Sequence, residues 1–154
     1  MQAAPIPPNS KNLFFIRHGE RADKYLDQKQ TNTLITPNGM DQALKTGIFL
    51  AQTLDKQKNP DNQEILILSS PYLRCIQTAY YIIQSLQKSN IKIYNNTIYY
   101  TSHLKEWQKK NGETIMTSCQ WDKEIEEFKP NFSSNKNFQI KKSSLQQPDN
   151  ETNS

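Results

Sequence analysis

The chain has 154 residues, a length that predicts a single domain. Only 34% of the residues are hydrophobic, which is low for a globular chain, so we expect extended loops or tails. The net charge of +4 suits a protein that attracts phosphate esters. Nucleic acid is a poor candidate partner, because the lysines are scattered instead of clustered on one face.

Targeting and membrane-spanning segments are not evident in the sequence. The two cysteines, Cys75 and Cys119, lack CxxC spacing, which fits a reducing compartment. Residues 1–11 contain three prolines and no apolar stretch of the kind found in signal peptides. No run approaches the roughly 18 apolar residues that a membrane span needs. We therefore expect a soluble, cytoplasmic protein that binds no membrane.

The N-terminal third predicts a strand followed by a helix. Residues 1–11 form a Pro-rich polar lead, which we expect to be disordered. The apolar run Leu13-Phe14-Phe15-Ile16 ends in a charged cluster, a pattern typical of a buried strand that leads into a polar loop. Thr36-Pro37 predicts a helix start, because Thr caps helices well and Pro is favoured at the first helical position. Apolar residues at i, i+3 and i+4 spacing continue that helix to residue 54.

The middle of the chain repeats this pattern. Residues 65–68 (ILIL) predict a second buried strand, and Ser70-Pro71 predicts the start of a second helix. Residues 91–94 (IKIY) alternate in hydrophobicity, as in a strand at the edge of a sheet. Strands separated by long helical patterns predict an α/β fold with an open, mostly parallel sheet and flanking helices.

The order of the pattern fades after Trp121. Residues 131–154 are rich in Ser, Asn, Lys and Gln and poor in apolar anchors, so we expect a polar, disordered tail. The predicted organisation is therefore a lead over residues 1–11, one domain over 12–130 and a tail over 131–154.

The charged cluster at residues 17–21 (RHGER) is the strongest candidate site. It follows the first predicted strand, and open α/β sheets bind ligands at the carboxyl ends of their strands. Arginine offers a planar fork of donors that matches phosphate oxygens. Positive charge on both sides of His18 favours its neutral, nucleophilic form. The alternative is a solvated charged turn in which His18 is an ordinary surface residue.

Residues 14–21 (FFIRHGER) resemble the signature of the histidine phosphatase superfamily, which has the phosphoglycerate-mutase-like fold. Three further blocks resemble later signatures of that superfamily in the same order: 35–43 (ITPNGMDQA), 67–79 (ILSSPYLRCIQTA) and 104–107 (LKEW). The resemblance implies a phosphoric monoester hydrolase of the phosphatase branch. Its substrate would be a phosphorylated small molecule or a phosphoprotein.

The resemblance also implies a role for each matching residue. His18 would be the nucleophile that forms a phosphohistidine. Arg17 and Arg74 would clamp the phosphoryl oxygens, and Arg21 would add a further donor. Glu106 would act first as general acid and then as general base. No metal or other cofactor is implied, because the arginines supply the positive charge.

Other residues of these blocks have structural interpretations. Glu20 is expected to orient the loop and not to take part in the chemistry. Thr36, Gly39 and Gln42 are expected to serve helix entry and packing.

The superfamily's second histidine, in a Ser-His-Gly turn after an apolar strand near the C-terminus, has no counterpart here. His103 lies in Ser-His-Leu, just before Glu106, and is not expected to touch phosphate. We therefore expect a fold that is incomplete on its C-terminal side, as in a truncated copy, or a protein partner that completes the sheet. Two hypotheses follow: a phosphatase of impaired activity, or a non-catalytic pseudoenzyme that acts as a binding or scaffold protein.

Overall fold

The computed structural model describes residues 12–25, 32–55, 64–104, 118–129 and 138–144. The predicted lead over residues 1–11 lies outside them. Within this part of the chain, no helix is both long and apolar enough to cross a membrane. The elements, in chain order, are η1 (Ala22–Tyr25), α1 (Pro37–Asp55), β1 (Glu64–Ser69), α2 (Leu73–Lys88), β2 (Lys92–Tyr100), η2 (Ser102–Leu104), α3 (Ser118–Phe128) and β3 (Gln139–Lys142).

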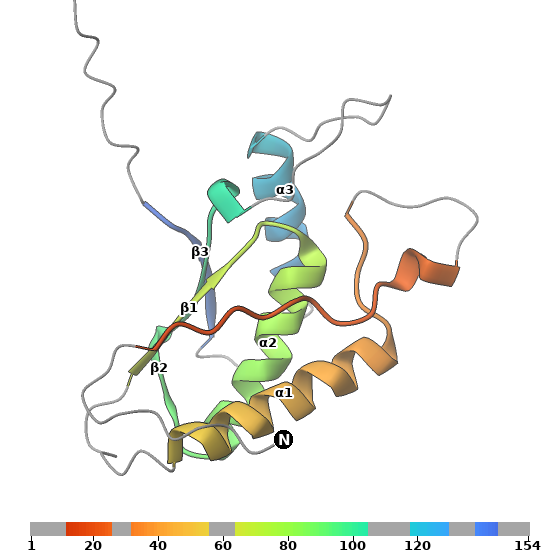
Figure 1. Cartoon of the computed structure of the whole chain (residues 1–154). Coiled ribbons are helices and arrows are strands. Elements are labelled where there is room, and N and C mark those ends of the chain that lie inside the picture. The colour runs from red at the N-terminus through yellow and green to blue at the C-terminus, as the bar shows by residue number, and fades with distance from the viewer. Residues whose placement is uncertain (1–11, 26–31, 56–63, 105–117, 130–137, 145–154) are drawn as a thin grey trace, which may run out of the picture.

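The described strands form one sheet in the order β1-β2-β3, and both pairings are parallel. Helix α2 connects β1 to β2 and packs on both strands, and α1 packs on α2 (Figure 1). This arrangement confirms the predicted α/β fold with a parallel sheet and flanking helices. It also aligns the carboxyl ends of the strands at one edge of the sheet.

Helix α1 begins where the sequence predicts. Pro37 is its first residue, and the hydroxyl of Thr36 accepts a hydrogen bond from the Gly39 N–H at 2.9 Å, as an N-cap does. Helix α2 begins at Leu73, two residues after the predicted start at Pro71. The two helices are in close contact at Gly47, where an added Cβ would lie 2.6 Å from the backbone oxygen of Ile82.

The core lies between α2 and the sheet. Its most buried side chains are aliphatic and come from α2, β2 and α3: Ile76, Ile83, Leu86, Ile98 and Ile125. Burial of a side chain of this size stabilises the fold by about 1.5–3 kcal/mol relative to an exposed position. The core therefore fixes α2, and with it the residues at the start of that helix.

Strand β2 lies between β1 and β3 in the described sheet, but β3 pairs only with its residues 97–100. Its first residues, 92 and 93, pair with β1 alone among the described strands, which agrees with the edge pattern predicted for residues 91–94. The alternation places Ile93 in the core and leaves Lys92 and Tyr94 exposed, and the strand is interrupted directly after these residues. The register changes between Ile65↔Ile93 and Ile67↔Ile98, and Asn95 and Asn96 have positive φ values of 51° and 47°. Asparagine adopts this left-handed conformation more readily than most residues, which allows β2 to bulge.

The C-terminal part of the chain contains two elements that the sequence analysis missed. Helix α3 buries Trp121, Ile125 and Phe128, which are spaced by four and three residues along one helical face. Strand β3 pairs with β2 and buries Ile140 against the core. The prediction of disorder over 131–154, and of a domain that ends at residue 130, is therefore wrong for residues 138–144. Residues 130–137 and 145–154 lie outside the described part.

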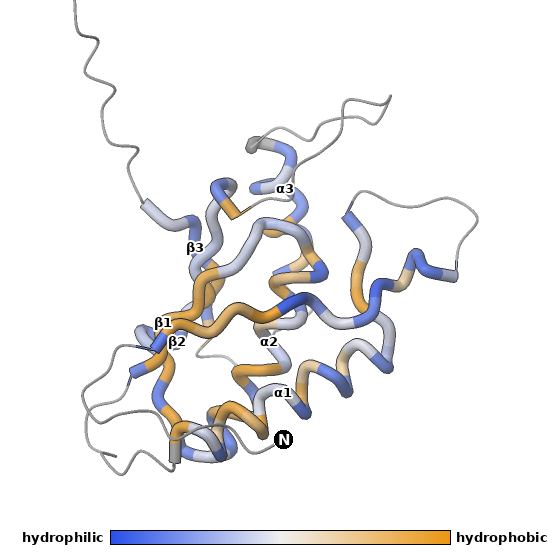
Figure 2. Tube along the Cα trace, viewed as in Figure 1, coloured by the Kyte–Doolittle hydropathy of each residue, from blue (hydrophilic) through white to orange (hydrophobic). Residues whose placement is uncertain are grey.

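The first predicted strand is absent: residues 13–16 form no strand with any described segment. Their side chains are exposed instead of buried, and Leu13 and Phe15 are 77% and 89% exposed. One face of β1 is also open, because Leu66 is 61% exposed. Figure 2 shows that the segment and β1 are both hydrophobic. A buried strand needs a hydrogen-bonded neighbour and a covered face, and the described residues supply neither to residues 13–16.

Candidate functional site

The loop that begins at His18 is attached to α2 through a buried hydroxyl group. The Gly19 N–H donates to Oγ1 of Thr78 at 3.0 Å, and that hydroxyl donates to the Arg74 carbonyl at 2.7 Å. Thr78 is buried, so these bonds are shielded from water. The sequence block that contains Arg74 and Thr78 therefore positions the loop as well as the arginine.

The residues just before α1 bind the other side of the loop. Arg21 and Ile35 form an antiparallel bridge, and the Ala22 N–H donates to the Leu34 carbonyl at 2.9 Å. The Ile35 N–H donates in turn to Oε1 of Gln77 on α2, at 2.8 Å. The loop is thus enclosed between α2 and the entry to α1.

Two glycines allow the loop and the first turn of α1 to come into close contact. A Cβ added to Gly19 would lie 2.5 Å from the Gly39 carbonyl oxygen. A Cβ added to Gly39 would lie 2.6 Å from the carbonyl oxygen of Glu20 and 2.7 Å from its nitrogen. These neighbours are backbone atoms that cannot rotate away, so only glycine fits at either position.

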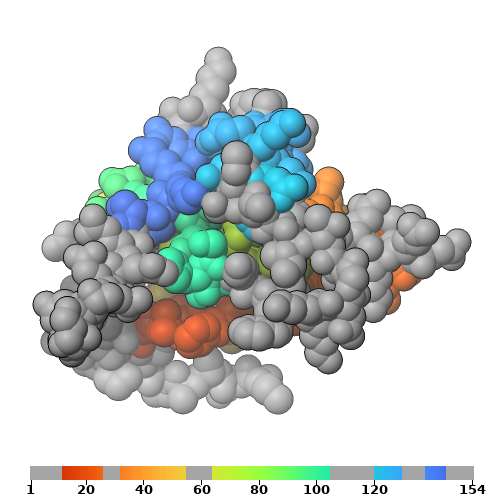
Figure 3. Space-filling view, turned by 90° about the horizontal axis from the view of Figure 1, so that it is seen from above, coloured from red at the N-terminus to blue at the C-terminus, as the bar shows by residue number. Residues whose placement is uncertain are grey.

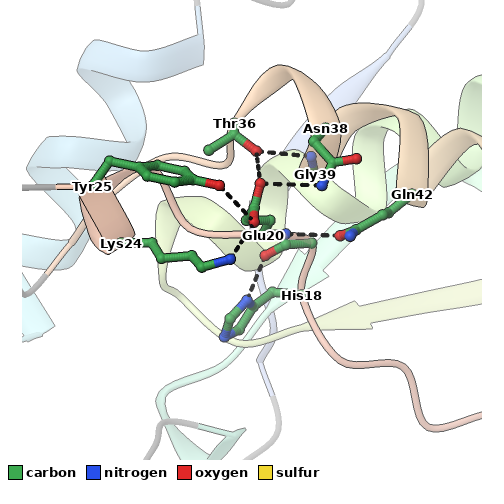
Figure 4. Close-up of polar contacts among 9 residues, drawn as sticks. His18, Glu20, Lys24, Tyr25, Thr36, Asn38, Gly39 and Gln42 are labelled. Carbon is green, nitrogen blue, oxygen red and sulfur yellow. Dashed lines mark hydrogen bonds and ion pairs between the residues drawn. The ribbon is translucent and has the colours of Figure 1, made fainter.

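Glu20 is the centre of a polar network (Figure 4). Its Oε1 accepts from Nζ of Lys24 at 2.8 Å and from the Tyr25 hydroxyl at 3.1 Å. Its Oε2 accepts from the Thr36 hydroxyl at 2.9 Å and from Nδ2 of Asn38 at 3.1 Å. The Glu20 side chain is 13% exposed. The hydrogen bonds from Lys24, Asn38 and Thr36 lower the pKa of the Glu20 carboxyl to about 2. Glu20 is therefore ionised at neutral pH and joins η1 to the start of α1.

His18 is half-buried, and one ring nitrogen is already engaged. Nδ1 lies 2.8 Å from the carbonyl oxygen of Gly19. A carbonyl oxygen can only accept, so Nδ1 carries the proton in this contact. In the neutral ring the lone pair is then on Nε2. The residue thus has the tautomer required for a nucleophile that attacks through Nε2.

The surroundings of His18 favour that neutral form. Burial lowers the pKa of His18 below its ordinary value, and the hydrogen bond to Gly19 opposes this effect. The positive charges of Arg74, Arg17 and Arg21 lower the pKa further. Although Arg17 and Arg74 are far apart in the sequence, both therefore lie close enough to act on the same imidazole.

The three arginines are held in different ways. Arg17 is exposed. Arg74 is 2% exposed, and its guanidinium lies 4.0 Å from the centre of the Tyr72 ring. Arg21 donates to both carboxylate oxygens of buried Asp23, from Nε at 2.8 Å and from Nη2 at 2.6 Å. The prediction that these arginines bind phosphate stays a prediction. In the structure Arg21 is bonded to a carboxylate, a partner that the sequence analysis did not anticipate.

Two other residues named from the sequence contribute nothing to the described site. Glu106 lies outside the described residues. His103 is exposed on η2, and its Nδ1 lies 2.9 Å from the hydroxyl of Thr101.

Figure 3 looks onto the end of the sheet at which the parallel strands finish. In that view the first described residues, coloured red, lie on the surface, and the residues at the end of β2 lie between them and the pair formed by α3 and β3.

Sequence reasoning assigned Thr36, Gly39 and Gln42 to helix entry and packing. The structure shows that they also form the socket for Glu20: Thr36 binds its carboxylate, Gly39 contacts its backbone, and Oε1 of Gln42 accepts its N–H at 3.0 Å. The sequence contains a signal for these shared contacts. The three residues recur every three positions at the start of one helix, a spacing that places side chains on the same helical face.

The site therefore places a nucleophilic nitrogen near the positive charges of Arg17, Arg21 and Arg74. A neutral imidazole can attack an electrophilic centre through Nε2. Guanidinium groups beside it attract an anion and stabilise negative charge that develops during group transfer. The arrangement suits a reaction between an anionic group and a nucleophilic nitrogen.

Comparison with known proteins identifies a family that matches most of the chain. The family described as "Histidine phosphatase superfamily (branch 1)" matches residues 13–144. The solved structure of the ecdysone phosphate phosphatase from Bombix mori, in complex with tungstate, is similar to the chain at 17% sequence identity and a TM-score of 0.46. That similarity covers 81% of this chain and 69% of the other. No curated protein sequence gives a significant match.

Proposed function

The chain belongs to the histidine phosphatase superfamily, and from this premise we propose that it hydrolyses phosphoric monoesters through a phosphohistidine on His18. The observation that carries the proposal is the state of the His18 ring. Nδ1 is engaged by the Gly19 carbonyl, and burial together with three arginines lowers the pKa of the imidazole. Both effects leave Nε2 as an unprotonated nucleophile near neutral pH.

In the first step Nε2 of His18 attacks the phosphorus of the monoester. A P–N bond forms while the P–O bond to the alcohol breaks, and the leaving oxygen takes a proton from Glu106. Arg17 and Arg74 bind the phosphoryl oxygens and stabilise the charge that spreads over them. The role of Glu106 follows from family membership and from its place in the Leu-Lys-Glu-Trp block.

In the second step water attacks the phosphorus of the phosphohistidine. Glu106, now a carboxylate, accepts the proton of the water. The P–N bond breaks, its electron pair returns to Nε2 of His18, and inorganic phosphate is released. The enzyme then returns to its starting state.

The arginines contribute unequally in this proposal. Arg74 is buried and stacked on Tyr72, so its guanidinium is pre-positioned and loses little freedom when a phosphate binds. Arg17 is exposed and can guide an incoming anion. Arg21 adds positive charge while it remains on Asp23. A phosphorylated small molecule or a phosphoprotein would both present the required group.

A second candidate function is a non-catalytic protein that binds a phosphorylated ligand or serves as a scaffold. The exposed segment at residues 13–16 favours it, because an apolar stretch that pairs with no described segment of the chain is suited to a protein partner that completes the sheet. Catalysis by the chain alone would then be weak, while the arginines would still bind an anion.

Trapping of the phosphoenzyme tests the proposal. The purified chain is mixed with a 32P-labelled aryl phosphate, quenched in base and assayed for acid-labile label. His18→Ala should abolish the label, whereas His103→Ala, which changes the other histidine of the chain, should retain it. Label that survives in His18→Ala removes His18 as the acceptor. Absence of label in the parent chain, with retained vanadate binding, supports the non-catalytic alternative.

A further inference from the structure

The peptide unit between Gly19 and Glu20 connects His18 to helix α1. Its carbonyl oxygen, which belongs to Gly19, accepts from Nδ1 of His18 at 2.8 Å. Its N–H, which belongs to Glu20, donates to Oε1 of Gln42 at 3.0 Å. These two groups lie in one rigid plane, because the peptide bond does not rotate freely. A bond that fixes the N–H therefore also fixes the direction of the carbonyl that meets the imidazole.

The peptide plane is held on its other side through Glu20. The carbonyl of Glu20 accepts from the Thr36 N–H at 2.8 Å, and its carboxylate accepts from the Thr36 hydroxyl and from Asn38. The backbone of Glu20 lies so near Gly39 that a Cβ at position 39 would be 2.6 Å from the Glu20 carbonyl oxygen. Rotation of the peptide would break these contacts together.

We propose that Glu20 and Gln42 are positioning residues that hold the Gly19 carbonyl against Nδ1 of His18 and so keep the lone pair of the ring on Nε2. The arrangement is the backbone counterpart of a carboxylate that orients a catalytic histidine. The consequence for catalysis rests on the proposed phosphatase function. The effect on the ring itself does not depend on turnover.

Glu20 acts here through the backbone and not as a catalytic acid. Four donors from Lys24, Tyr25, Thr36 and Asn38 occupy its carboxylate oxygens. They keep its pKa far below neutrality, so it has no proton to give. Gln42 lies on the exposed side of α1, where water can partly replace its amide. Loss of Glu20 should therefore disturb His18 more than loss of Gln42.

The test is the tautomer of His18, measured by 15N NMR in the full chain. A His103→Asn background leaves His18 as the only histidine. In that background the neutral ring should carry its proton on Nδ1. Gln42→Leu, which removes the acceptor at an exposed position, should produce a mixture of tautomers, and Glu20→Ala should produce a larger fraction of the Nε2-protonated form. Gln42→Glu keeps an oxygen acceptor and should retain the parent tautomer.

Kinetics separate positioning from simple destabilisation. With an aryl phosphate, kcat should fall about tenfold in Gln42→Leu, as expected for one hydrogen bond, with KM nearly unchanged. The fall should reach about 100-fold in Glu20→Ala, in proportion to the displacement of the ring. Asp41→Asn is a matched control, because Asp41 precedes Gln42 on the same helix and pairs only with exposed Lys45 in the described part of the chain. An unchanged tautomer in folded Gln42→Leu and Glu20→Ala overturns the proposal, whether or not the chain is active.

Discussion

Residues 13–16 precede Arg17 and residues 19–22 follow His18. The two segments differ in how they contact the rest of the described chain. The first group is apolar but exposed, and it forms no strand with any described segment. The second group is polar, yet each of its residues is bonded or bridged to α1, to α2 or to residues 34–36. Hydrophobicity alone therefore does not decide which side of the site is bonded to the rest of the described chain.

The comparison shows that helices, more than a preceding strand, set the geometry of the His18 loop. The sequence analysis placed His18 directly after a predicted strand at residues 13–16, which forms no strand with any described segment. The loop is instead fixed from its C-terminal side by Thr78, Gly39 and Glu20. The apolar side chains of residues 13–16 and one face of β1 are left exposed by the described residues. The contacts that fix this loop do not show which residues bind phosphate.

The largest effect should come from Gly39→Ala. In an ordinary helix this change stabilises the protein by about 0.5–1 kcal/mol, because alanine has the higher helix propensity. Here the new Cβ would lie 2.6–2.7 Å from the backbone of Glu20, so we expect a loss of about 3 kcal/mol instead. Urea unfolding followed by circular dichroism measures the change. Lys45→Ala, at an exposed site on the same helix, should stay within about 0.5 kcal/mol of the parent. A stabilised Gly39→Ala chain would show that the loop does not rest on α1.

A smaller effect is expected from Thr78→Val. The change keeps the shape of the side chain and removes the hydroxyl that accepts from the Gly19 N–H. A buried N–H without a partner costs about 1–3 kcal/mol, so the free energy of unfolding should fall by about 2 kcal/mol. Thr78→Ser keeps the hydroxyl and should recover most of the loss. Equal stability of the valine and serine variants would mean that water reaches this bond.

The sequence predicted best what depends on neighbours along the chain. The cap at Thr36, the first position of Pro37 and the strand-helix-strand unit around α2 were all identified, because local residues specify them. The apolar run at residues 13–16 was identified as a strand, but a strand also needs a partner, which no local pattern can supply. Strand β3 was missed because Ile140 is the single buried side chain in a short polar segment.

In the candidate site, too, the features that depend on neighbouring residues were predicted, and the contacts between distant residues were not. His18 and its neighbouring arginines were identified from a compact motif, and their effect on the imidazole agrees with the charge argument. The contacts of Thr78 with Gly19 and of Gln42 with Glu20 join residues 59 and 22 positions apart. Such contacts depend on how α1 and α2 pack against the loop, so sequence periodicity could indicate only which face of its own helix Gln42 or Thr78 occupies.

The smallest effect should come from Phe15→Ser, at the most exposed large side chain of residues 13–16. Burial of an aromatic side chain contributes several kcal/mol, and its loss from a core costs about 3–5 kcal/mol. Phe15 is 89% exposed, so it has almost none of this to lose, and the free energy of unfolding should change by less than about 0.5 kcal/mol. Ile76→Ser, which introduces a polar group at a fully buried position of α2, is the contrasting control and should be strongly destabilising. The same urea titration measures both variants. A Phe15→Ser chain that lost several kcal/mol would show that this segment is buried in solution, either within the chain or against a second copy, and dilution of the sample would separate those two cases because only the second depends on concentration.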